Sequence, residues 1–153
     1  MEEIQVKNLV ILGLVAVILL PLLMAGCAEK AATTTTPTIQ KDQTISISQD
    51  EFSANASITQ YIEMLNGGTL TVRLYSNPST GYSWGDAEIT HASVIEQLSR
   101  NFEEPTTNAL GAPGTEVWVF HAIDTGLAII KISYGRPWES ETLYNLTINI
   151  NVR

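Results

Sequence analysis

The chain has 153 residues, with eight Lys or Arg against sixteen Asp or Glu, and its formal net charge at pH 7 is −8. The basic residues are few and never clustered, which argues against a nucleic-acid partner. The only cysteine is Cys27, so an intrachain disulfide is excluded and packing alone has to hold any folded domain together.

The first segment, residues 1–27, has the pattern of an export signal. Residues 9–23 are apolar except for one Gly and one Pro, and Met24-Ala25-Gly26-Cys27 follows. An apolar run of this length that ends in small residues is typical of a signal peptide. The ending also resembles a lipobox, the cleavage signal of prokaryotic lipoproteins, and the resemblance implies that Cys27 becomes a lipidated N-terminus.

The alternative is an uncleaved membrane anchor, because the apolar run is almost long enough to span a bilayer. Both interpretations place the rest of the chain outside the cytoplasm, either anchored to the cell membrane or secreted. Residues 28–43 follow, with four consecutive threonines at 33–36 and no apolar periodicity. We interpret them as a flexible tether, which would span roughly 20–25 Å on average and roughly 50–55 Å when stretched.

Residues 44–153 are expected to form a single all-β domain. Strict alternation of apolar and polar residues over 143–152 predicts a strand with one buried face. Residues 69–75 repeat the pattern, residues 44–48 form a shorter copy, and residues 58–65 make a further apolar run. The inward positions of the two shorter patterns would be Ile45, Ile47, Leu70, Val72 and Leu74.

Two turns and one ambiguous segment complete the expected elements. Asn66-Gly67-Gly68 predicts a tight hairpin turn between two of these strands. Residues 116–122 and 127–134 are expected to pair as a hairpin through residues 124–126. Residues 89–98 have a partly helical composition, but their β-branched residues and β context favour a strand.

The proposed hairpin carries apolar residues on both faces. We assign one set to the core and expect the other to cover a second face or an edge. The core set is Trp118, Phe120, Ala128, Ile130 and Ile132; the second set is Val117, Val119, Leu127 and Ile129. About seven to eight short strands with frequent turns predict an immunoglobulin-like β-sandwich without a disulfide.

Three candidate loops interrupt these strands, and each is shaped by Pro and Gly. The first is Asn77-Pro78-Ser79-Thr80-Gly81-Tyr82, followed by Trp84. The middle one is Leu110-Gly111-Ala112-Pro113-Gly114-Thr115, and the third is Arg136-Pro137-Trp138-Glu139. Rigid scaffolds commonly present binding residues on such loops.

At these residues the chain resembles the chagasin family, small immunoglobulin-like inhibitors of papain-type cysteine peptidases. The family has a loop of the form Asn-Pro-Thr-Thr-Gly-Tyr/Phe with a trailing Trp, a Gly-rich middle loop and an Arg-Pro-Trp loop. The order and spacing match over residues 43–153. Ser79 replaces the first Thr of the pattern and keeps its hydroxyl, and the middle loop has fewer glycines than some relatives.

The resemblance implies a reversible, tight-binding inhibitor that blocks the peptidase cleft with its three loops. Ser79 and Thr80 would lie near the catalytic cysteine, and the other two loops would grip either side. The implied contact residues are Asn77, Pro78, Ser79, Thr80, Gly81, Tyr82, Gly111, Ala112, Pro113, Gly114, Thr115, Arg136, Pro137 and Trp138. Tyr82 could instead pack beneath its own loop, and Arg136 could brace its loop.

The residues themselves are compatible with that role. Pro78 fixes its own backbone and restricts Asn77, and Gly81 permits a turn that a side chain would resist. Trp138 follows a Gly-Arg-Pro stretch that offers little to bury it, and Trp is enriched among interface anchors. Trp84, at an expected strand start, is assigned to the core with Trp118 and Phe120.

Nothing in the sequence suggests catalysis or a cofactor. His91 and His121 are expected on strand surfaces, no nucleophile has a neighbouring base, and no metal-ligand spacing occurs. We therefore expect a monomeric binding protein and not an enzyme, with a papain-like cysteine peptidase as its protein partner. The alternative is an extracytoplasmic immunoglobulin-like module that binds a partner other than a peptidase.

Overall fold

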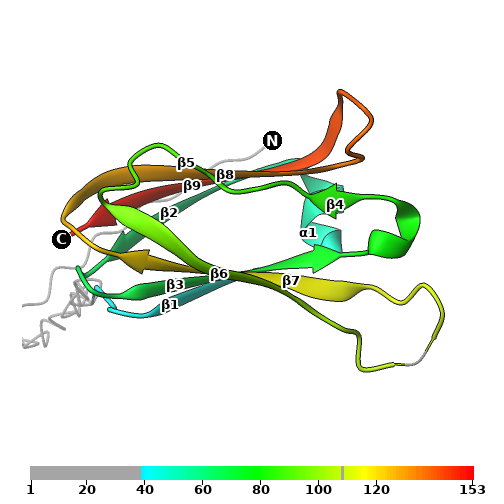
Figure 1. The fold of residues 1–153 in the computed structure, drawn as a ribbon, viewed down its shortest axis with the longest axis horizontal. Helices are drawn as coiled ribbons and strands as arrows, with labels where there is room; N and C mark the ends of the chain where they lie inside the picture. Colours follow the sequence, from blue (N-terminus) through cyan, green and yellow to red (C-terminus); the bar gives the residue numbers. More distant parts are fainter. Residues whose placement is uncertain (1–38, 108) are drawn as a thin grey trace, which may run out of the picture. The chain divides into compact units, whose positions relative to one another are not determined.

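The computed structural model describes residues 39–107 and 109–153. The predictions for the leader, for Cys27 and for most of the tether concern residues outside this part. The described part is all-β and consists of two sheets packed face to face, as predicted (Figure 1). Its nine strands exceed the expected seven to eight because two of them, β4 and β5, are only two residues long.

The first sheet has the strand order β1-β3-β7-β6, and the second has the order β2-β9-β8-β4, with β5 also paired to β8. The edge strands β1 and β2 run parallel to their neighbours β3 and β9. The elements in chain order are β1 (Gln43–Ile47), α1 (Gln49–Ala54), β2 (Ser57–Met64), β3 (Thr69–Ser76), the 3-10 helix η1 (Pro78–Thr80), β4 (Ser83–Trp84), β5 (Glu88–Ile89), β6 (Ile95–Glu103), β7 (Gly114–Ala122), β8 (Gly126–Gly135) and β9 (Thr142–Val152).

The core lies between the sheets and is built from the alternating residues of the long strands. In β3, β8 and β9 every second residue is buried, because successive side chains of a strand point to opposite faces. The buried apolar and aromatic residues of these strands are Leu70, Val72, Leu74, Ala128, Ile130, Ile132, Tyr134, Leu146, Ile148, Ile150 and Val152. Trp118 and Phe120 of β7 are fully buried among them, and Trp84 is only 2% exposed.

The four residues of the second apolar set in β7 and β8 differ in how deeply they are buried. Val117 is buried without belonging to the core cluster, beside its cross-strand partners Arg73 and Asn101. Val119 and Ile129 are half-buried, whereas Leu127 is 68% exposed.

Both predicted hairpins are wrong, because the strands on either side of each turn do not pair with each other. The chain does turn at residues 65–68 and at 123–126, but β2 and β3 belong to different sheets, and so do β7 and β8. Each turn therefore carries the chain across the core from one sheet to the other. Period-two alternation shows that two strands bury a face, but it does not distinguish neighbours in one sheet from strands that face each other.

The expected single strand over residues 89–98 was also wrong. Residues 88–89 form β5 in the second sheet, and β6 begins at Ile95 in the first sheet. The chain turns between them, where the amides of Val94 and Ile95 donate to the carbonyl oxygen of His91. His91 thus lies in an exposed turn and not on a strand, whereas His121 lies in β7 as expected.

Helix α1 was not predicted, although its start carries a recognisable signal. Ser48 and Glu51 form a capping box: the Ser48 hydroxyl accepts from the Glu51 amide, and the Glu51 carboxylate accepts from the Ser48 amide at 2.8 Å. These hydrogen bonds from Ser48 lower the pKa of Glu51. The helix places Phe52, which is fully buried, between the sheets beside Trp84 and Tyr144.

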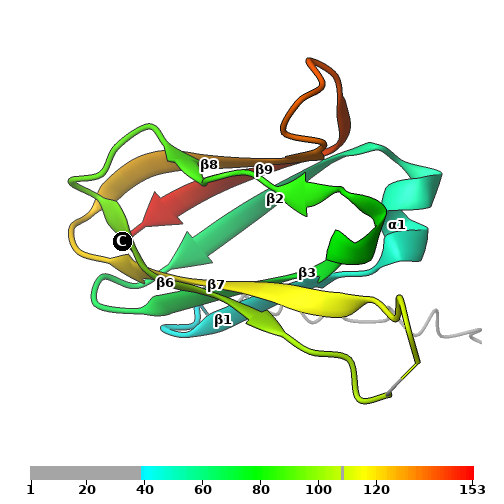
Figure 2. The same cartoon turned by 45° about the vertical axis from the view of Figure 1, so that its right-hand side comes forward.

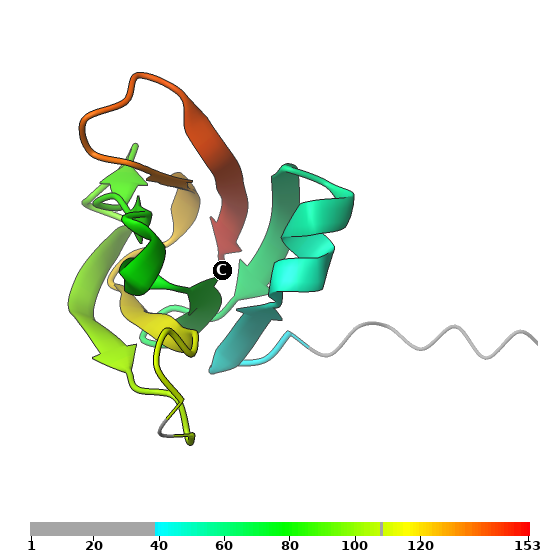
Figure 3. The same cartoon turned by 90° about the vertical axis from the view of Figure 1, so that its right-hand side faces the viewer.

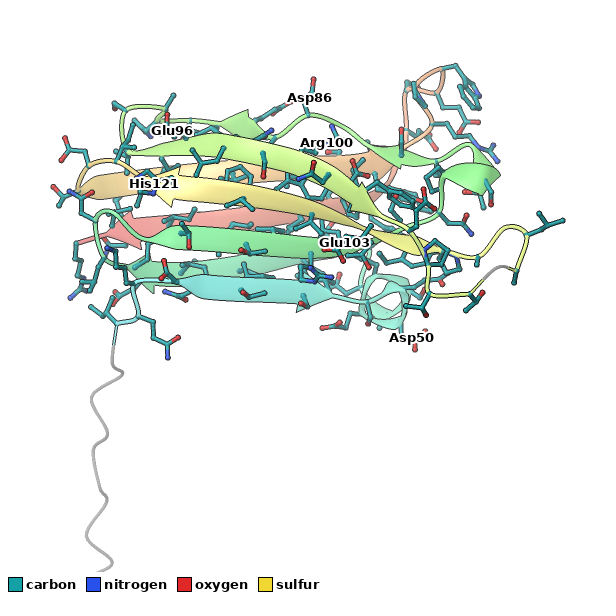
Figure 4. The ribbon with its side chains drawn as sticks, turned by 60° about the horizontal axis from the view of Figure 1, so that its bottom comes forward. Asp50, Asp86, Glu96, Arg100, Glu103 and His121 are labelled. Carbon is teal, nitrogen blue, oxygen red and sulfur yellow. The ribbon has the colours of Figure 1, made fainter. Side chains whose placement is uncertain are left out.

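A charged cluster around Arg100 connects the two sheets. Arg100 of β6 pairs with Glu116 and Asp86, donates to the carbonyl oxygen of Trp84 in the second sheet, and lies 5.1 Å from the ring centre of Trp118. Figure 4 shows Arg100 and Asp86 close together at the same edge of the sandwich. One side chain thereby connects β4, β6 and β7.

Replacing Trp84 by Ala should lower the free energy of unfolding by about 3–5 kcal/mol, because the cavity left by a buried ring is not refilled. Urea unfolding measures the loss. The matched control is Leu98→Ala, which removes a side chain that is 56% exposed and should cost under about 0.5 kcal/mol. Equal losses in the two variants would contradict the core assignment of Trp84.

Replacing Ser48 by Ala should destabilise the domain by about 0.5–2 kcal/mol, since the first turn of α1 loses its cap. Ser53→Ala in the same helix is the control, because Ser53 is exposed and does not cap the helix. Thermal unfolding of both variants measures the difference, and a Ser48 variant as stable as the control would show that the cap is dispensable.

Candidate inhibitory surface

Strand register brings the three candidate loops to one end of the sandwich. The last residue of β3, Ser76, pairs with Gly114 at the start of β7, and Ser83 at the start of β4 pairs with Gly135 at the end of β8. The first loop (residues 77–82) therefore lies between the middle loop (104–113, with 108 not described) and the third loop (136–141). Figures 2 and 3 show all three projecting from the same end.

The first loop is a hydrogen-bonded turn and not an extended segment. Residues Pro78–Thr80 form the 3-10 helix η1, and Gly81 follows with a left-handed backbone at φ +81°. The carbonyl oxygen of Asn77 accepts from the Thr80 amide at 3.2 Å and from the Thr80 hydroxyl at 2.7 Å. The Gly81 amide donates to the carbonyl oxygen of Pro78 at 3.0 Å, which closes the turn.

Asn77 connects this turn to its surroundings. Its side-chain nitrogen donates to the carbonyl oxygen of Gly111 in the middle loop at 3.1 Å, and its amide donates to the Tyr134 hydroxyl of β8 at 3.1 Å. Its side-chain oxygen accepts from the Ser79 hydroxyl at 2.6 Å. Asn77, a half-buried residue, thus connects the first loop to the middle loop through its side chain and to β8 through its backbone amide.

Tyr82 packs beneath its own loop. One neighbour is the Tyr134 ring, stacked with its centre 5.7 Å away, and the other is the Arg136 guanidinium, 4.4 Å from the Tyr82 ring centre. A guanidinium held over an aromatic face is attracted by the ring's quadrupole. These contacts join the first and third loops and favour packing within the site as the role of Tyr82.

Tyr134 lies beneath both loops and is buried. Its ring also stacks on Tyr144 and lies 4.9 Å from the ring centre of Trp84, so the loops stand directly on the aromatic part of the core. Burial raises the pKa of Tyr134, while its hydrogen bond with the Asn77 amide acts in the opposite direction. The hydroxyl therefore stays protonated at neutral pH and can keep its position under the loop.

The third loop is braced from within. Arg136 donates to the Glu139 carboxylate at 3.0 Å, and this hydrogen bond raises the pKa of Arg136. With its guanidinium between Glu139 and Tyr82, Arg136 braces its own loop. Trp138 of the same loop remains 71% exposed and is available to a partner.

Trp138 rests on Gly81 of the first loop. A Cβ atom built on Gly81 would lie 3.1 Å from Cη2 of Trp138, so any side chain there would push against the indole. Gly81 is therefore favoured for two reasons. Its backbone is left-handed, and its lack of a side chain leaves room for the Trp138 ring. The first and third loops consequently form one connected surface.

The middle loop ends earlier than the sequence suggested. Gly114 and Thr115, assigned to this loop, are the first residues of β7. Gly114 lies beneath Phe102, since an added Cβ would come within 2.4 Å of both the Phe102 ring and the carbonyl oxygen of Glu103. Ala112 and Pro113 remain in the loop, and Gly111, with φ +76°, turns the chain beside Ser79.

Leu110 is a functional candidate that the sequence analysis placed in the middle loop but not among the contact residues. It precedes Gly111 and is fully exposed, at 104% of its reference area. With Ser79, Phe102 and Ala112 it lines a hollow of about 470 Å³ between the first and middle loops. A large apolar side chain next to a Gly in a candidate loop was a usable signal in the sequence.

The chemistry of this end of the sandwich is suited to binding. No group of three or more His, Cys, Asp or Glu side chains that could hold a metal occurs within residues 39–107 and 109–153. In the same ranges, no helix is long and apolar enough to cross a membrane. The exposed tips instead present a Leu, two hydroxyls and a Trp, on loops fixed by internal hydrogen bonds.

Residues 63–152 match the family model described as the chagasin family peptidase inhibitor I42. The chain belongs to this family. The matched region contains all three loops, from Asn77 to Glu139, and every strand from β3 to β9. Family members are peptidase inhibitors and not enzymes, in agreement with the sequence prediction.

Individual relatives and solved structures agree with this membership. Amoebiasin-2 of Entamoeba histolytica is 30% identical over 86 residues, which cover 55% of this chain and 70% of that protein. Chagasin of Trypanosoma cruzi is 34% identical over 85 residues, covering 48% and 76% respectively. A cysteine protease inhibitor from Entamoeba histolytica has the same fold, with a TM-score of 0.56, 23% identity and coverage of 73% and 97%.

A second solved structure, of PbICP-C in complex with falcipain-2, also shares the fold. It superposes with a TM-score of 0.54 at 18% identity and covers 74% of this chain and 99% of that one. At such identities the two solved structures establish the fold alone.

Replacing Gly81 by Ala should destabilise the first loop by about 1–2 kcal/mol and displace Trp138, because the left-handed backbone and the indole both oppose a Cβ. Gly85→Ala is the matched control: its Cβ would meet only the Ser133 carbonyl oxygen at 3.6 Å. Urea unfolding, together with acrylamide quenching of the exposed Trp138, measures both effects. Identical results for the two variants would contradict the packing of Trp138 on Gly81.

Proposed function

We propose that this protein is a reversible, tight-binding inhibitor of papain-like cysteine peptidases that blocks the active-site cleft with its three loops. The observation that carries the proposal is the joining of the loops into one surface: Asn77 ties the first loop to the middle loop, and Tyr82 and Gly81 tie it to the third. Membership in a peptidase-inhibitor family supports this function. The complex of the structurally similar PbICP-C with falcipain-2 supports the class of partner.

The exposed residues suggest a division of roles. Ser79 and Thr80, both exposed at the tip of η1, would approach the centre of the cleft. Leu110 and Trp138 would then contact opposite walls, since their loops flank the first loop on either side. Because internal contacts already fix the loops, little conformational entropy is lost on binding, which favours high affinity.

We further propose that the domain is presented from a membrane by a lipidated Cys27 and the tether. The entry point of the chain supports this arrangement. Gln43 at the start of β1 pairs with Leu70 near the start of β3, and Gln40 bridges Met64. The loops follow the other end of β3, roughly 25 Å away at the rise of a strand. An anchor upstream of residue 39 would therefore leave the loops free to meet a peptidase.

The direct test is a titration of papain and a cathepsin L-type enzyme with the purified full chain. We expect stoichiometric loss of activity that is recovered on dilution, with the inhibitor left uncut. Absence of inhibition at micromolar concentrations of folded protein would overturn the proposal and favour a binding module with a partner other than a peptidase.

The proposed lipid anchor has its own test. Metabolic labelling with a palmitate analogue should label the wild type but not Cys27→Ala.

Replacing Trp138 by Ala should weaken inhibition by about 2–4 kcal/mol in binding free energy while the fold survives, as expected for an exposed aromatic anchor. Leu127→Ala is the control, because Leu127 is similarly exposed but lies on the outer face of the second sheet. Inhibition constants and thermal unfolding separate the two effects. A Trp138 variant that loses stability without a separate binding defect would contradict this role.

A further inference from the structure

We propose that Asn77 is a positioning residue that protects the first loop from hydrolysis by the peptidase that it blocks. The inference rests on the proposed function, since it concerns the fate of the loop inside the cleft. The hydrogen bonds of Asn77 hold the loop in a form that the peptidase cannot cut.

Hydrolysis by a cysteine peptidase makes two demands on a bound peptide. The thiolate adds to a carbonyl carbon, whose oxygen becomes negative and must accept hydrogen bonds from the enzyme. The C–N bond then breaks, the leaving amine takes a proton, and water releases the new carboxylate from the acyl-enzyme. The carbonyl oxygen must therefore be free, and the chain on both sides must be able to extend along the cleft.

The first two residues of the first loop, Asn77 and Pro78, meet neither demand. The carbonyl oxygen of Asn77 already accepts two hydrogen bonds from Thr80, and that of Pro78 accepts one from Gly81. The backbone between them is a 3-10 turn followed by a left-handed residue, which is far from the extended form. To become a substrate, the loop would first have to open.

Asn77 opposes that opening from three directions. Its side-chain nitrogen is bound to the Gly111 carbonyl oxygen, its side-chain oxygen to the Ser79 hydroxyl, and its amide to the Tyr134 hydroxyl. Two of these bonds belong to the side chain and would be lost in Asn77→Ala. The turn would then keep its own short-range hydrogen bonds and the bond from the residue 77 amide to Tyr134, but its connection to the middle loop would be lost and its open form would become more populated.

The role differs from that of a contact residue. Asn77 is half-buried, whereas Pro78, Ser79 and Thr80 are exposed, so the peptidase would touch the tip of the turn and Asn77 would act from behind it. Loss of a contact residue shortens the lifetime of the complex. Loss of Asn77 should additionally shorten the lifetime of the inhibitor chain itself.

The experiment incubates the full chain with an excess of papain, so that weakened binding does not hide cleavage, and follows the intact mass over time. The wild type should stay intact, whereas Asn77→Ala should be cut within residues 77–82 at least about tenfold faster. The matched control is Asn149→Ala, on the far part of β9, which should remain as intact as the wild type. Thermal unfolding establishes that each variant is folded.

Thr80→Val provides a second, isosteric variant in case Asn77→Ala does not fold. It removes the hydroxyl bond to the Asn77 carbonyl oxygen, and we expect faster cutting at the same site. If the wild type inhibits but the folded variants are cut no faster than Asn149→Ala, the inference is wrong and the proposed function stands. If the wild type does not inhibit, or is itself cut in the first loop, the proposed function fails and the inference fails with it.

Discussion

The position of the Tyr134 ring is the constraint on which the rest of the structure depends. The ring closes the core at one end through Trp84 and Tyr144, and it carries Tyr82 and the Asn77 amide on its other side. A shift of this ring would therefore disturb the packing between the sheets and the first loop together. Stability and binding are linked here, because the loops use the core as their foundation.

The sequence was sufficient for the fold class and for the identity of the loops. Alternation in β3 and β9 is strict because one face is buried and the other is not, so a single sequence reveals it. Pro78, Gly81 and Pro137 mark the loops because each imposes or permits one particular backbone. Neither feature depends on residues distant in the chain, which is why both could be predicted.

Strand partners and contacts between loops could not be predicted, because they depend on pairs far apart in sequence. Nothing local indicates that β7 and β8 face each other across the core, or that Asn77 bonds to Gly111. The stacking of Arg136 on Tyr82 likewise appears only when two loops meet. Helix α1 is different: its capping box is visible in the sequence, but the β pattern around it outweighed the signal.

The pairing of β2 with β9 has a consequence for how the domain is made. Ser57 lies beside Asn145, so the second sheet is assembled from segments at opposite ends of the folded region. During synthesis β2 emerges early and has no partner until the last strand leaves the ribosome. Such long-range pairing slows folding and leaves an edge exposed for longer. The second sheet can therefore be completed only once β9 is available to pair with β2.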